Sequence, residues 1–149
     1  MLRYKKEIIV TAFIVVGSIA AVLIALNKHI SSQKIAIHFP KGTISASKAI
    51  TPEQFTNGLG GTSNLGQNSG MLFIFNTPAK FGIWMRDMKY PLDIIWLSSS
   101  KTIVTIDQDV SPYTYPQTFY PSDNSKYVLE VNAGTAKRLD LSDGTKASF

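Results

Sequence analysis

The stretch FGIWMRDMKYPLDIIWL, from Phe81 to Leu97, decides the fold of this chain. It is rich in the apolar residues of buried strands, yet four charged side chains interrupt it. Proline donates no backbone hydrogen bond and holds its predecessor in an extended conformation, so Tyr90-Pro91 breaks the run. The pattern therefore predicts a strand through residues 83–88 and a second strand after the break, with charged side chains near the junction.

Arg86, Asp93 and Glu130 form a candidate polar cluster. A strand-turn-strand path of seven residues can bring Arg86 to Asp93, and a guanidinium group matches a carboxylate with two parallel hydrogen bonds. Glu130 lies in the alternating pattern YVLEV, where it shares a face with Val128. Such a cluster is either a structural network of ion pairs, which is the commoner case, or an active site.

Short apolar and alternating segments predict a β-rich domain around this stretch. Thr51 can cap a short helix in which Pro52 is the first residue and Gln54 completes a capping box, and residues 133–139 form a second short helix. Strands are expected at residues 34–39, 42–50, 71–75, 94–97, 102–106, 127–131 and 145–149. Together these elements predict an α+β fold with a mainly antiparallel, curled or barrel-like sheet and two short helices.

Residues 8–26 contain no charge, and as a helix they are long enough to cross a membrane. Basic residues before this run favour a cytoplasmic N-terminus. A cleaved signal peptide is the alternative, but no small-residue cleavage site follows the run. We therefore expect a cytoplasmic basic tail (1–7), a transmembrane anchor (8–26), a stalk (27–33) and an extracytoplasmic β-rich domain (34–149) at the cell membrane.

The net charge of +5 belongs mainly to the region of the expected anchor. Residues 35–149 hold ten basic and nine acidic side chains in dispersed positions, which does not favour binding to nucleic acid. The chain has no cysteine, so metal sites with thiolate ligands are excluded. Its two histidines, His29 and His38, do not have the spacing of a metal-binding pair. We expect neither a metal nor a cofactor.

The segment 107–124 contains three prolines and four aromatic residues, too many prolines for pairing in a sheet, and predicts a long loop. Aromatic rings beside a few polar groups suit contact with a glycan or a peptide. The candidate ligand contacts in and near this loop are Trp84, Lys89, Tyr113, Tyr115, Phe119 and Tyr120. If these rings do not bind a ligand, they only cover the core.

Five motifs resemble, in their order, domain of unknown function 192, also called uncharacterised protein family 0127. They are Gly58-Leu59-x-Gly61, Gly70-Met71-Leu72-Phe73, Trp84-Met85-Arg86-Asp87, Pro91-Leu92-Asp93-Ile94 and Tyr127-Val128-Leu129-Glu130-Val131-x-Ala133-Gly134. The resemblance covers about residues 42–149 and implies a small β-rich bacterial or archaeal domain, often behind a signal or an anchor. It implies no established activity. Some members carry a pair of cysteines in the long loop, but this chain has none, so a redox role is not implied.

Two functions remain open. The first is a membrane-anchored extracytoplasmic module that binds an envelope ligand, such as a glycan or a peptide, or assists another protein there. The second is a carboxylate-dependent hydrolase in which Asp93 and Glu130 form an acid/base pair. The hydrolase requires both carboxyl groups to face one cleft, whereas the binding module requires only an accessible aromatic and polar surface.

Overall fold

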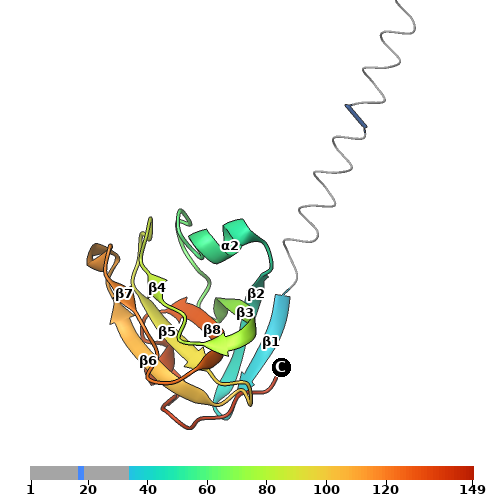
Figure 1. The fold of residues 1–149 in the computed structure, drawn as a ribbon, viewed down its shortest axis with the longest axis vertical. Helices are drawn as coiled ribbons and strands as arrows, with labels where there is room; N and C mark the ends of the chain where they lie inside the picture. Colours follow the sequence, from blue (N-terminus) through green and yellow to red (C-terminus); the bar gives the residue numbers. More distant parts are fainter. Residues whose placement is uncertain (1–16, 19–33) are drawn as a thin grey trace, which may run out of the picture. The chain divides into compact units, whose positions relative to one another are not determined.

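Six strands form one sheet, in the order β1-β2-β3-β8-β5-β6, in the computed structural model, which describes residues 17–18 and 34–149 (Figure 1). The strands are β1 (Lys34–Phe39), β2 (Gly42–Ala49), β3 (Ser69–Ala79), β5 (Leu92–Leu97), β6 (Ile103–Val110) and β8 (Ser125–Asn132). β2 and β3 are parallel, and the other neighbours in this order are antiparallel. The predicted mainly β domain is therefore confirmed, with a mixed rather than a wholly antiparallel sheet.

Two short strands and three short helical segments complete the described domain. β4 (Ile83–Trp84) pairs with β7 (Thr118–Phe119) in a separate two-stranded sheet. The helical segments are α2 (Pro52–Asn57), the single 3-10 turn η1 (Pro112–Thr114) and α3 (Thr135–Arg138). The two predicted α-helices are thus present, and α2 has the predicted capping box between Thr51 and Gln54.

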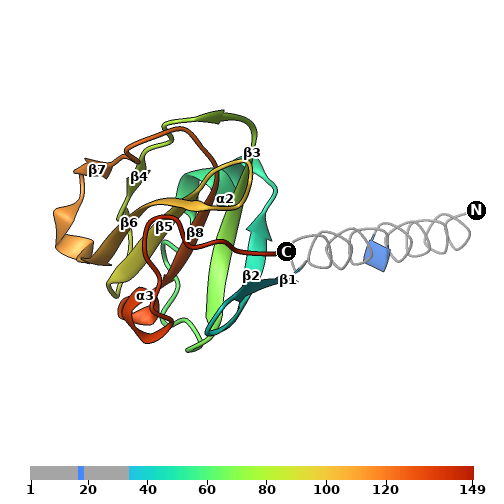
Figure 2. The same cartoon turned by 90° about the horizontal axis from the view of Figure 1, so that it is seen from below.

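The six-stranded sheet curls but does not close into a barrel. The last residues of the chain bridge its two edges, because Ser148 pairs with His38 of β1 and Lys146 pairs with Thr102, just before β6. The C-terminus accordingly lies beside β1 in both views (Figures 1 and 2). The expected final strand at residues 145–149 is replaced by these isolated bridges, which cover one end of the curled sheet.

The two faces of the sheet carry separate apolar cores. One face, which we call the α3 face, packs against residues in and after α3, including Ala136 and Leu139. The other face, the α2 face, packs against Leu59, just after α2, and against Ile83 and Met85 in and after β4. Alternate residues of a strand point to opposite faces, so the apolar residues of the central strands β8 and β5 are divided between the two cores.

The stretch that opens at Phe81 differs from its predicted course in one respect. The strand β4 ends at Trp84, and Asp87 has a φ angle of 58°. This left-handed conformation is incompatible with a continuing ladder of strand hydrogen bonds. The prediction of a regular strand through residues 83–88 is therefore wrong, while the second strand, Leu92–Leu97, is present and buried along its whole length.

The expected N-terminal segments fall outside the described residues. This applies to the tail (1–7), the stalk (27–33) and, apart from Gly17 and Ser18, the anchor (8–26). Within the two described ranges, the structure contains no helix that is long and apolar enough to span a bilayer.

Candidate functional site

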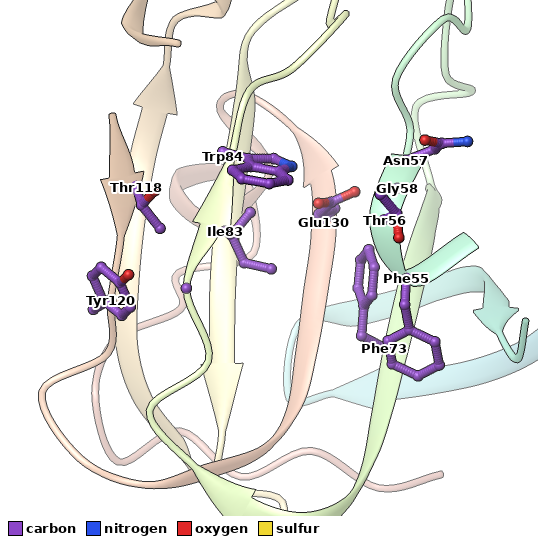
Figure 3. Close-up of a pocket in the computed structure, with 11 residues that line it drawn as sticks. Phe55, Thr56, Asn57, Gly58, Phe73, Ile83, Trp84, Thr118, Tyr120 and Glu130 are labelled. Atoms are coloured by element: carbon purple, nitrogen blue, oxygen red, sulfur yellow. The ribbon is translucent and has the colours of Figure 1, made fainter. Parts of the chain in front are cut away.

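A pocket of about 250 Å³ opens on the α2 face (Figure 3). We call it the Glu130 pocket, because the side chain of Glu130 lies between Trp84 and the end of α2 (Figure 3). Its lining comes from α2, β3, β4, β8 and the segment around β7, and comprises Phe55, Thr56, Asn57, Gly58, Phe73, Gly82, Ile83, Trp84, Thr118, Tyr120 and Glu130. Segments far apart in the sequence thus meet at one site.

Glu130 is placed in the pocket by its strand. β8 lies between β3 and β5, with Met71 and Ile94 as the cross-strand neighbours of Glu130. Because Val128 belongs to the core of the α2 face, strand alternation directs Glu130 to that same face, as the sequence predicted. The residue is only 4% exposed. The carboxyl group of Glu130 is therefore buried on the largely apolar α2 face of the sheet.

The carboxyl group of Glu130 is incompletely satisfied. The backbone of Leu59 provides one hydrogen bond, but the buried Oε2 atom has no hydrogen-bond partner. Burial raises the pKa of Glu130 to about 8, and the hydrogen bond from Leu59 opposes this rise only in part. With that pKa, about nine in ten of these carboxyl groups are protonated at pH 7.

Gly58 packs closely against this carboxyl group. It ends α2 with a φ angle of 53°, and its N–H donates to the carbonyl oxygen of Gln54 at 2.9 Å. A Cβ atom at this position would lie 3.0 Å from Oε2 of Glu130 and 3.3 Å from Cζ of Phe73. Glycine is therefore required for the backbone conformation, and it also avoids a close contact with Glu130 and Phe73 that any side chain would make.

Aromatic rings form much of the pocket wall. Phe55 of α2 contacts Phe73 of β3 edge to face, with a centroid distance of 5.9 Å. Trp84 is 43% exposed, and Tyr115 packs against its edge at 6.3 Å. Tyr120 is also exposed and lies on the opposite side of the pocket from Phe55 (Figure 3). The wall thus offers accessible ring faces as well as buried ones.

Arg86 connects two of the residues that line the pocket. Its Nη2 atom donates to Oδ1 of Asn57 at 2.8 Å, and its guanidinium carbon lies 5.4 Å from the ring centre of Trp84. A longer contact of 3.8 Å joins Nε of Arg86 to the exposed Asp87. Arg86 therefore ties the end of α2 to the β4 segment, and the expected ion pair with Asp93 is not formed.

Asp93 has two backbone partners on the other side of the sheet. Its Oδ1 accepts from the N–H of Asp109 at 2.9 Å, and its Oδ2 accepts from the N–H of Ala136 at 2.8 Å. Gly134, the N-cap residue of α3, has no side chain with which to cap the helix. Asp93 therefore caps α3 from a neighbouring strand and also fixes β6 at Asp109, where the φ angle is 52°.

The three members of the predicted polar cluster are thus separated. Asp93 lies two residues before Ile95 on the same strand and therefore faces the same side, that of the α3 core. Glu130 lies in the pocket on the α2 face. The two carboxyl groups do not share a cleft, so the geometry gives no support to a hydrolase that uses them as an acid/base pair. Of the three residues, only Glu130 lines the pocket, with Arg86 bonded to its neighbours.

The predicted ligand contacts divide between two places. Trp84 and Tyr120 line the Glu130 pocket, and Tyr115 supports Trp84. Lys89 and the almost fully exposed Tyr113 line a separate hollow beside Pro91. The structure therefore brings some of the predicted aromatic residues to the Glu130 pocket, and not the predicted lysine.

Sequence reasoning did not single out Phe55, Asn57 or Phe73 as site residues. The capping box predicted that Phe55 lies on a short helix. No local sequence pattern, however, predicts that this helix packs near Glu130. The described residues include no group of three histidine, aspartate or glutamate side chains arranged to hold a metal ion.

Comparisons with known proteins support the domain assignment. The model of the family DUF192, described as "Uncharacterized ACR", matches residues 35–149. A putative transcription regulator from Sinorhizobium meliloti 1021 is similar in structure, with a TM-score of 0.75, 29% identity and coverage of 79% of this chain and 95% of that chain. A protein of unknown function from Novosphingobium aromaticivorans DSM 12444 has a TM-score of 0.72, 28% identity and coverage of 79% and 86%. No curated protein matches the sequence.

Proposed function

This chain belongs to the DUF192 family, and we propose that it is a binding module whose ligand site is the Glu130 pocket. The single observation that carries the proposal is the unpartnered Oε2 of Glu130 in an open pocket with aromatic walls. Buried polar atoms are almost always hydrogen-bonded, and one that is left without a partner costs about 1–3 kcal/mol. A ligand that supplies the missing partner recovers this free energy on binding.

The form of the pocket supports the same function. Small-molecule sites are concave and mostly apolar, with a few polar groups that fix the orientation of the ligand. Here Phe55, Phe73 and Trp84 supply apolar surface, and Glu130 supplies a polar group directed between them. These features suit one ring or one side chain of a larger ligand.

The proposed setting of this module is the outer surface of the cell membrane. The uncharged residues 8–26 serve as the anchor, and the domain that begins at Lys34 lies outside the membrane. The ligand in this proposal is an envelope glycan or peptide. An accessory role beside a partner protein uses the same pocket, with a partner side chain as the ligand.

A role in transcription is suggested only by the name of the Sinorhizobium meliloti protein. In this chain, residues 35–149 carry ten basic and nine acidic side chains. Proteins that follow the phosphates of DNA concentrate positive charge on one face. The near balance of charge therefore favours the pocket over a nucleic-acid surface.

The two tryptophans provide a direct test of the proposed site. We suggest recording the indole N–H signals of the full-length protein by NMR, in a nonionic detergent, during titration with cell-wall glycan fragments and short peptides. Trp84 lines the pocket, whereas Trp96 is fully buried and its N–H donates to the carbonyl oxygen of Phe81 at 2.9 Å. We expect the Trp84 signal to shift and the Trp96 signal to stay in place.

Two variants locate the binding surface. Trp84→Ala should weaken any binding that this titration reveals, because it removes an accessible wall of the pocket. Tyr113→Ala is the matched control, since Tyr113 is 96% exposed and lines the other hollow. A Trp84 signal that stays in place with every fragment and peptide would contradict the proposed function.

A further inference from the structure

We infer that the ligand group held by Glu130 is a primary ammonium on an unbranched alkyl stem, as at the end of a lysine side chain. This inference rests on the proposed binding site and names the chemistry that fits it. Glu130 acts as the counter-ion of the ammonium group, and the aromatic wall surrounds the stem. The carboxylate and the ammonium then form a buried, hydrogen-bonded ion pair.

The charges around the pocket favour a cation over an anion. Glu130 is the only carboxyl group in the pocket lining, and the lining contains no lysine, arginine or histidine. The nearby guanidinium group of Arg86 already has partners in Asn57 and Trp84. An anionic ligand would meet the carboxyl group of Glu130 with no cationic side chain in the lining to pair with, whereas an ammonium group supplies the charge and the donor that Oε2 lacks.

The aromatic wall favours the same ligand. A cation near the face of an aromatic ring is attracted by the ring quadrupole, most strongly by tryptophan, and more so when water is excluded. Trp84 already holds the guanidinium group of Arg86 in this way. The rings of Phe55 and Phe73 lie on the other side of Glu130 and offer apolar contact to an alkyl stem (Figure 3).

An alkyl ammonium group fits this arrangement better than a hydroxyl group does. A hydroxyl can accept a hydrogen bond from the protonated form of Glu130 or donate one to an oxygen of either form, and it leaves the aromatic faces without a charge to attract. The ammonium group donates to the ionised form and also interacts with the rings. The ammonium group therefore selects the ionised form of this carboxyl group, whereas a hydroxyl group is compatible with both forms.

The pH dependence of binding distinguishes the two states. Burial raises the pKa of Glu130 to about 8, so ionisation rises from about 1% at pH 6 to about 90% at pH 9. The elements packed against Glu130 present Met71 and Phe73 from β3, Ile94 from β5 and Gly58 from the end of α2. The titratable or charged groups at the pocket are Tyr120 in the lining and Arg86 beside it. Arg86 keeps its positive charge over this range.

The probe is Nα-acetyl-lysine amide, titrated into the full-length protein by calorimetry. We expect its affinity to rise at least about 10-fold from pH 6 to pH 9, because the ionised fraction of Glu130 rises over this range. At pH 6 each bound probe should release nearly one proton, which is measured by repeating the titration in buffers of different ionisation enthalpy. Nα-acetyl-norleucine amide, which has the same four-carbon side chain without the ammonium group, should bind at least about 10-fold more weakly at pH 9.

Two glutamate variants assign the effect to this carboxyl group. Glu130→Gln keeps the shape of the side chain but removes its charge, so we expect it to abolish both the preference for lysine amide and the pH dependence. Glu53→Gln is the matched control, because Glu53 lies on the exposed surface of α2 and outside the pocket. The control should bind as the wild type does.

The results separate this inference from the function on which it rests. The analogue with a hydroxyl in place of the ammonium group is Nα-acetyl-6-hydroxynorleucine amide. If it binds as tightly as lysine amide, or if the affinity for lysine amide falls with rising pH, the inference of an ammonium ligand is wrong, although the pocket is still a binding site. Tighter binding of glucosamine than of lysine amide overturns the alkyl stem. A Trp84 indole signal unmoved by these amines and by every glycan fragment and peptide overturns both the inference and the proposed function.

Discussion

Asp93 and Glu130 are buried on adjacent strands, yet their surroundings differ in almost every respect. In the pairing of β5 with β8, Asp93 lies opposite Val131 and Glu130 lies opposite Ile94. Asp93 faces the α3 side and accepts two backbone hydrogen bonds. Glu130 faces the α2 side and has one oxygen without a partner. Burial alone therefore does not distinguish a carboxyl group with two backbone partners from one with an oxygen that lacks a partner.

The difference has a simple energetic basis. The N–H groups of Asp109 and Ala136 offset the cost of burying Asp93 and join two elements to the sheet. Glu130 receives one backbone hydrogen bond and no opposite charge, so the folded protein favours its neutral form. The first carboxylate thus stabilises the fold, whereas the second lowers stability when it ionises.

The largest expected effect is a change in the pH dependence of stability at Glu130. Its pKa is about 8 in the folded protein, against 4.5 for an ordinary glutamate. A raised pKa gives stability that is fully present below pH 4.5 and is lost as the pH rises through 8. We expect Glu130→Gln to remove this loss, and to be more stable than the wild type at pH 9 by on the order of 3–5 kcal/mol.

Urea unfolding at pH 5, 7 and 9 measures this effect. The exposed residue Glu53 provides the control, since Glu53→Gln should keep the pH profile of the wild type. If the wild type and Glu130→Gln give parallel profiles, the pKa of Glu130 is not raised in the folded protein, and the contrast with Asp93 disappears.

The second effect is a loss of stability at Asp93. Asp93→Ala leaves the N–H groups of Asp109 and Ala136 without their acceptors. An unsatisfied buried donor costs about 1–3 kcal/mol, so we expect a total cost of about 3 kcal/mol. Urea unfolding at pH 7 tests this value against Asp143→Ala, at an exposed aspartate. Equal stability of the two variants would show that Asp93 does not hold α3 and β6.

A smaller effect is expected at Gly58, and Gly61 provides a close control. Both have positive φ angles, of 53° and 77°, so alanine strains the backbone at either position by about 1–3 kcal/mol. Only at Gly58 does the new Cβ also approach Glu130 and Phe73, because nothing lies within 4 Å at Gly61. Gly58→Ala should therefore cost about 1 kcal/mol more than Gly61→Ala. It should also weaken binding in the Glu130 pocket, and equal costs would indicate that the neighbours of Gly58 move aside freely.

Local patterns predicted much of the fold. Alternation located β1 and β8, the capping box located α2, and the uninterrupted apolar run MLFIF placed β3 inside the sheet. Alternation also placed Glu130 on the same face as Val128. These features depend on neighbouring residues in the sequence, so the sequence alone was sufficient to predict them.

The arrangement of the site could not be predicted in the same way. Strand alternation gives a side chain one of two faces, but only the curl of the sheet and the pairing of β5 with β8 show that Asp93 and Glu130 face apart. The left-handed conformation of Asp87 carried no strong signal, although it ends the strand and turns Arg86 toward Asn57. The missed pocket residues depend on such long-range contacts.

The smallest expected effect concerns Arg86, which the sequence predicted to pair with Asp93. A double-mutant cycle with Arg86→Ala and Asp93→Ala should give a coupling free energy below about 0.5 kcal/mol, because the two residues share no partner. The parallel cycle with Arg86→Ala and Asn57→Ala should give about 0.5–1.5 kcal/mol, since it removes a hydrogen bond of 2.8 Å near the surface. Both couplings come from urea unfolding at pH 7. A larger coupling of Arg86 with Asp93 than with Asn57 would show that Arg86 interacts with Asp93, as the sequence predicted. The surroundings of Asp93 and Glu130 on the two faces of the sheet would then not be independent of each other.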